Sequence, residues 1–126
     1  MYWSVSKGKV MKYEFEKVGK FTMIHINGNL DTAETTKQLD NEIAEMSREG
    51  QHHFVFNLER TTYLDSAGLS IFIHCLCDVQ ENKGSIFIIA EDNQVRRVLE
   101  MVGMNRLITT YGSREDFISA QELAVV

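Results

Sequence analysis

Proline is absent from this 126-residue sequence, and cysteine occurs only twice, as Cys75 and Cys77. The two cysteines lie two positions apart in a segment with helical periodicity, so their side chains point about 200° apart and cannot readily form a disulfide. A single pair also offers too few ligands for a structural metal site. We therefore expect two small buried hydrophobic side chains, with no bound metal or cofactor.

The sequence also lacks a basic cluster and a long apolar run. Its 13 Lys and Arg residues are outnumbered by 18 Asp and Glu residues, and the densest basic group is Arg96-Arg97. A nucleic-acid-binding surface needs concentrated positive charge. No apolar stretch reaches the ~18 residues of a membrane-spanning helix, and residues 1–10 lack the apolar middle of a signal peptide. These absences predict a cytoplasmic protein that binds neither nucleic acid nor membrane.

An alternation of strand and helix patterns makes up most of the chain. Hydrophobic residues account for 44% of it, which is enough for a core that needs no disulfide. After a flexible leader at residues 1–11, we expect a single α/β domain over residues 12–126, with a mixed, mostly parallel sheet of about five strands and about four helices. The expected strands are 11–18, 21–26, 53–58, 85–90 and 106–111, with Glu16 on the exposed face of the first. The expected helices begin at Asp31, Ser66, Glu91 and Ser113, with Val102 on the buried face of the third.

In sheets of this kind, the loops that follow the carboxyl ends of the strands gather at one edge and carry the functional groups. Three loops are expected there, at residues 27–32, 59–66 and 90–94. The middle loop ends with Asp65 and Ser66, directly before a long helical pattern. Either side chain can cap that helix by accepting a hydrogen bond from a free backbone N–H group. Alternatively, Ser66 accepts a phosphoryl group, because a helix N-terminus favours an anion.

Other functions that use a serine or an aspartate also need sequence motifs that are absent from this chain. The hydrolase pattern G-x-S-x-G is absent, because Leu64 rather than glycine lies two positions before Ser66. The phosphate-binding loop G-x-x-x-x-G-K-[ST] is also missing. A phospho-aspartate receiver needs an acidic pair after its first strand, whereas Asp31 stands alone. These absences predict a protein that is not an enzyme.

Three segments of the sequence, in this order and spacing, resemble one known family. They are INGNLDTAETTKQL, FVFNLERTTYLDSAGLSIFI and EDNQVRRVLEMVGMNRLI. Two motifs carry most of the likeness: G-x-[LI]-D, matched by residues 28–31, and D-S-[AS]-G-L, matched by residues 65–69. The family is that of the STAS domains of bacterial anti-sigma-factor antagonists. Many members have a second serine after the acceptor, where this chain has Ala67, so Ser66 is the candidate acceptor in the motif.

This resemblance implies a partner switch. The unphosphorylated chain would bind an anti-sigma factor with serine kinase activity, which would phosphorylate Ser66 and release the chain. A PP2C-type phosphatase would then restore the hydroxyl. A second interpretation stays open, in which a STAS domain regulates another output, such as secretion, a stressosome-type scaffold or small-ligand sensing. The expected partner-binding residues are Asp31, Thr32, Asp65, Ser66, Ala67, Gly68, Leu69 and Asn93.

Overall fold

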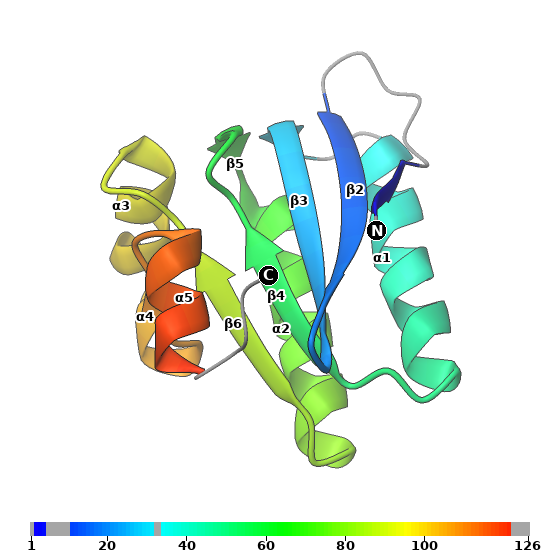
Figure 1. Ribbon diagram of the computed structural model, residues 1–126. Coiled ribbons are helices and arrows are strands. Elements are labelled where there is room, and N and C mark those ends of the chain that lie inside the picture. Colours follow the sequence, from blue (N-terminus) through cyan, green and yellow to red (C-terminus); the bar gives the residue numbers. More distant parts are fainter. Residues whose placement is uncertain (1, 5–10, 32–33, 122–126) are drawn as a thin grey trace.

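The computed structural model describes residues 2–4, 11–31 and 34–121, which form a mixed β-sheet with helices on both faces (Figure 1). The strands are β1 (Tyr2–Ser4), β2 (Met11–Val18), β3 (Phe21–Leu30), β4 (His53–Asn57), β5 (Thr61–Leu64), β6 (Ser85–Ile89) and β7 (Thr110–Tyr111). The helices are α1 (Glu34–Arg48), α2 (Ser66–Glu81), α3 (Gln94–Met101), α4 (Met104–Leu107) and α5 (Arg114–Ala120). The predicted α/β fold is confirmed.

The sheet has the strand order β1-β2-β3-β4-β6-β7, and β5 pairs with the carboxyl end of β3. The pairings of β1 with β2 and of β2 with β3 are antiparallel, and the remaining pairings are parallel. The parallel strands are connected through helices, as crossover connections require. This arrangement directs the carboxyl ends of β3, β5 and β6 toward the same edge of the sheet.

Two hydrophobic layers hold the helices on the sheet. On one face, α1, α2 and α3 bury apolar side chains against the strands, and the rings of Phe56 and Phe72 meet edge to face with their centroids 4.9 Å apart. On the other face, α5 packs on a smaller hydrophobic cluster, in which the ring centroids of Phe117 and Phe21 lie 5.2 Å apart. Beside α5, this face also carries a hollow lined by residues of β2, β3 and β4.

The amino-terminal strands differ from the sequence-based expectation. Tyr2–Ser4, within the expected leader, form β1 and pair with β2, whereas residues 5–10 lie outside the described part of the chain. The strand expected to end at residue 26 continues as β3 to Leu30, because its last residues pair with β5. Gly28 adopts φ +95°, which glycine tolerates best, and the register shifts directly after it.

Two further expectations near the carboxyl terminus were wrong. The strand expected at 106–111 is shorter, because Arg106 and Leu107 belong to the helical turn α4, and of the described residues in this range only Thr110 and Tyr111 pair with β6. Gly103, at φ +79°, ends α3 and allows the chain to turn into α4. Val102 was expected on the buried face of α3, but 53% of its surface is exposed, because α3 already ends at Met101.

Glu16 was expected on the exposed face of β2, and it is buried instead. Its carboxylate accepts two hydrogen bonds from the guanidinium of Arg114, at 2.6 and 2.8 Å, and lies 2.8 Å from Nε2 of His25. Arg114 is the first residue of α5. This ionic network therefore ties α5 to β2 and β3, and the pairing is what permits a carboxylate at this depth.

Candidate functional site

The three loops expected at the carboxyl edge of the sheet do meet there. The backbone N–H of Asp65 donates to the carbonyl of Leu30 at 3.3 Å, and a hollow of about 300 Å³ is lined by Asp31 and Ala67. On the other side of β5, a hollow of about 280 Å³ is lined by Thr62 and Asn93. Residues from β3, β5 and β6 loops thus surround the start of α2.

Asp65, and not Ser66, caps α2. The backbone of Asp65 is extended, and its Oδ1 accepts hydrogen bonds from the N–H groups of Ala67 at 3.0 Å and Gly68 at 3.2 Å. Ser66 is the first residue of the helix and is exposed, and its hydroxyl makes no hydrogen bond with any residue that the structure describes. The carboxylate therefore does the capping, and the serine oxygen is left accessible at the helix start.

Gly68 has a packing role that the sequence did not reveal. A Cβ atom at this position would lie 2.3 Å from the carbonyl oxygen of Leu30, far inside van der Waals contact. Gly68 is buried there, so its lack of a side chain lets the first turn of α2 approach the end of β3. Ala67, by contrast, is half-buried and borders the hollow beside Asp31.

The other expected contact residues occupy the rim of this site. Leu69 is half-buried and packs against the main core, which leaves part of its side chain at the surface. Asn93 caps α3 through its Oδ1, which accepts from the N–H of Arg96 at 3.2 Å. Asp31 is half-buried, and Thr32 lies outside the residues that the structure describes.

Tyr63 is a surface residue that the sequence analysis missed. It lies in β5 with 49% of its surface exposed, three positions before Ser66. The segment Thr61–Leu64 was expected to be loop, although its β-branched and aromatic residues favour a strand. Its two central residues, Thr62 and Tyr63, are both exposed, so the alternation of buried and exposed residues that usually reveals a strand is missing.

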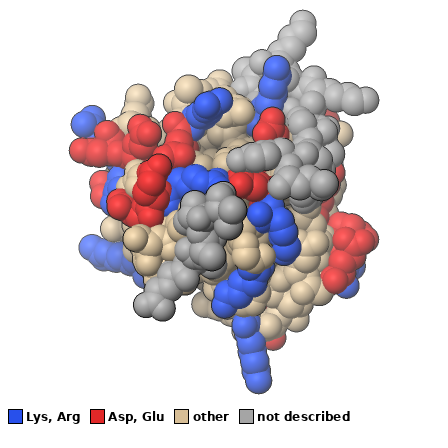
Figure 2. Space-filling view, in the orientation of Figure 1, with Lys and Arg blue, Asp and Glu red and all other residues tan. Residues whose placement is uncertain are grey.

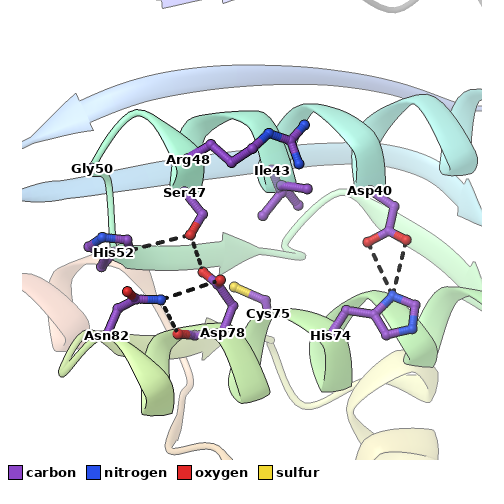
Figure 3. A pocket seen from close by; sticks show the side chains of 11 residues that line it. Asp40, Ile43, Ser47, Arg48, Gly50, His52, His74, Cys75, Asp78 and Asn82 are labelled. Carbon is purple, nitrogen blue, oxygen red and sulfur yellow. Dashed lines mark hydrogen bonds and ion pairs between the residues drawn. The ribbon is translucent and has the colours of Figure 1, made fainter.

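A second group of polar residues lies in a groove of about 570 Å³ between α1 and α2 (Figure 3). Oδ2 of Asp40 in α1 lies 3.0 Å from Nδ1 of His74 in α2. Nearer the other end, the hydroxyl of Ser47 donates to Asp78 and lies 3.3 Å from Nδ1 of His52. These polar groups pair with one another, so they connect the two helices.

The cysteines divide between the two sides of α2. Cys75 is buried, as expected, and this burial raises the pKa of its thiol, with a further contribution from Asp78. Its thiolate is therefore disfavoured. Cys77 is exposed, contrary to expectation, because it lies on the solvent side of the helix.

Comparison with known proteins agrees with this geometry. The STAS domain family matches residues 12–117, which is most of the chain. The chain is a STAS domain. Its helix-capping Asp65, exposed Ser66 and closely packed Gly68 are thus the D-S-A-G-L segment of this family member, and the predicted family is confirmed.

Several proteins similar to this STAS domain are named anti-sigma factor antagonists. An anti-sigma-B factor antagonist from Staphylococcus aureus is 28% identical over 89 residues, covering 71% of this chain and 82% of the relative. A crystal structure of an anti-sigma factor antagonist from Mycobacterium paratuberculosis has a TM-score of 0.78 at 19% identity, covering 92% of this chain and 97% of that one. The phosphorylated form of the Bacillus cell fate determinant SpoIIAA has a TM-score of 0.69 at 19% identity, covering 86% and 98%.

None of the helices in the described part of the chain is long and apolar enough to cross a bilayer.

Proposed function

We propose that this STAS domain is an anti-sigma-factor antagonist that acts in the cytoplasm through a phosphorylation-controlled partner switch. Its unphosphorylated form binds an anti-sigma factor that is also a serine kinase. The kinase transfers a phosphoryl group to Ser66, the complex dissociates, and a PP2C-type phosphatase restores the hydroxyl. The observation that carries this proposal is the exposed hydroxyl of Ser66 beside a helix cap that Asp65 already provides.

Asp65 caps the helix and Ser66 stays exposed, an arrangement that suits a modification site. Because Asp65 makes the capping hydrogen bonds, phosphorylation of Ser66 breaks none that the structure describes. The phosphate adds about −1.5 to −2 charges at the surface. It therefore alters what can dock at the start of α2 while the core of the domain stays unchanged.

The partner surface follows from the residues around Ser66. We place Asp31 and Ala67 on one side of the serine and Asn93 on the other, with Leu69 and Thr32 as further contacts. Gly68 contributes by keeping α2 close to β3 rather than by touching the partner. Tyr63 adds an exposed aromatic ring, a side chain that is enriched among the residues that dominate binding energy.

The related proteins support this proposal. The Staphylococcus aureus relative is named an anti-sigma-B factor antagonist, and SpoIIAA has been solved in a phosphorylated form. None of these names describes an enzyme, which agrees with a role in binding rather than in catalysis.

Phosphorylation can be tested in extract from the native host. The chain is incubated with this extract, ATP and Mg²⁺, and phosphopeptides are mapped by mass spectrometry. We expect one phosphoryl group on Ser66 and none in the Ser66→Ala variant. Ser70→Ala is the matched control, because Ser70 lies one turn further along α2, where its hydroxyl donates to the Ala67 carbonyl at 2.6 Å. A phosphate on Ser70, or none on either serine, would contradict the proposal.

A further inference from the structure

The sheet face beside α5 contains a polar basin of about 420 Å³. Residues from β2, β3 and β4, from the segment after β4 and from the start of α5 line it. Figure 2 views the molecule from this side and shows acidic and basic side chains interspersed rather than gathered by sign. The basin lies on the face opposite α2, and it shares Glu59 and Arg60 with the hollow beside Asn93.

The strand register fixes the floor of the basin. Glu14 of β2 pairs with His25 of β3, and His25 pairs with Asn57 of β4. Neighbouring strands lie about 4.8 Å apart, so this row spans roughly 10 Å. Asn27 lies two residues beyond His25 and therefore on the same face.

Several polar groups at the bottom of the basin are already paired. Glu16 binds both Arg114 and His25, as described above. Asn57 donates to the carboxylate of Glu59 at 3.1 Å and accepts from its backbone N–H at 3.0 Å. These contacts satisfy the polar groups of the floor through other residues of the chain.

Three other side chains lining the basin have no such partner. Within the described part of the chain, the Glu14 carboxylate, the Asn27 amide and the Arg60 guanidinium make neither a hydrogen bond nor an ion pair. Glu14 lies on β2 at one side, whereas Arg60 lies beyond the carboxyl end of β4. The basin thus presents one negative and one positive group at separate points, unlike the groove between α1 and α2, whose polar groups pair internally.

We propose that the polar basin binds a small zwitterion, with a free amino acid as the fitting class. The ligand's ammonium group donates to the carboxylate of Glu14, and its carboxylate accepts from the guanidinium of Arg60, a donor suited to bidentate contact. Asn27 offers an amide for a further hydrogen bond. A simple anion or a simple cation satisfies only one of the two charged groups, whereas a zwitterion satisfies both.

Binding can be measured by NMR with the full-length, ¹⁵N-labelled chain. Each standard amino acid is titrated separately, with acetate and ethylammonium as probes that carry only one charge. We expect at least one amino acid to shift the side-chain amide signals of Asn27 and Asn57 in a saturable manner. Neither single-charge probe should reach the same affinity. If no amino acid shifts these signals, or if acetate or ethylammonium binds equally well, the proposal is overturned.

Two substitutions test the role of the charges. Glu14→Gln and Arg60→Gln should each raise the Kd of the bound amino acid roughly tenfold or more, because each removes a charged hydrogen bond. Both side chains lack partners in the described fold, so the variants should fold normally. Glu49→Gln and Arg97→Gln are matched controls at exposed positions outside the basin and should leave the Kd unchanged. An unchanged Kd in Glu14→Gln or Arg60→Gln would contradict the assignment.

Discussion

Gly68 lies so close to the backbone of Leu30 that a methyl group on Gly68 would come within 2.3 Å of the Leu30 carbonyl oxygen. This contact sets the position of the first turn of α2 and hence of Ser66. Backbone cannot move aside as a flexible side chain can, so the helix start itself must shift to admit a methyl group.

Gly68→Ala should therefore lower the free energy of unfolding by about 1–3 kcal/mol, the usual cost of overpacking a buried site. Urea denaturation measures this loss. Ala67→Ser is the matched control, since Ala67 is half-buried at the surface and should change stability by less than about 0.5 kcal/mol. Equal stability of Gly68→Ala and the parent chain would show that the packing is looser than described.

Asp65 stabilises the start of α2 through its side-chain oxygen. Asp65→Ala should lower the free energy of unfolding by about 0.5–2 kcal/mol, because the N–H groups of Ala67 and Gly68 lose their acceptor. Asp65→Asn should recover most of this loss, since an amide oxygen also accepts the capping hydrogen bonds. Thermal or urea unfolding compares the three chains, and an alanine variant as stable as the asparagine variant would exclude the capping role.

Tyr63 should affect binding more than stability. Its side chain is about half exposed, so Tyr63→Ala should leave unfolding nearly unchanged. Binding to the kinase partner should weaken by about 1 kcal/mol or more, the range for truncation of a dominant contact residue. Val102→Ala, which also removes an exposed apolar side chain but at the end of α3, is the control for calorimetric titration. Similar affinities of the two variants would remove Tyr63 from the interface.

His53 should make the domain less stable in mild acid. Burial lowers the pKa of His53 below its usual 6.5, and the charges of Lys20 and His52 act in the same direction. The unfolded chain then binds a proton more readily than the folded chain, so stability falls as the pH drops below about 6.5. His53→Gln should reduce this fall between neutral and mildly acidic pH, as measured by urea denaturation across that range. If stability depends on pH identically in His53→Gln and in the parent chain, the lowered pKa of His53 is contradicted.

Much of the fold could be predicted from local pattern. The buried runs of β4 and β6 and the cap at Ser113 each depend on neighbours close in sequence, and the structure has them where they were expected. The position of Ser66 at a helix start also followed from the residue order around it, although that order left open whether Asp65 or Ser66 provides the cap.

The features that the sequence did not reveal depend on distant partners. Glu16 is buried because Arg114, 98 residues later in the chain, reaches its carboxylate. The small size of Gly68 serves a contact with Leu30, which only the pairing of β5 with β3 creates. Short strands such as β1 and β5 likewise form because they pair with neighbouring strands, so no local sequence pattern predicts them.

The partner switch is tested most directly by calorimetric titration of the kinase partner with two forms of this chain, one unphosphorylated and one fully phosphorylated on Ser66. An added charge inside a close-packed contact costs several kcal/mol, and each ~1.4 kcal/mol changes affinity tenfold. We therefore predict that phosphorylation weakens binding by about a hundredfold or more. Equal affinity of the two forms would contradict the proposed switch.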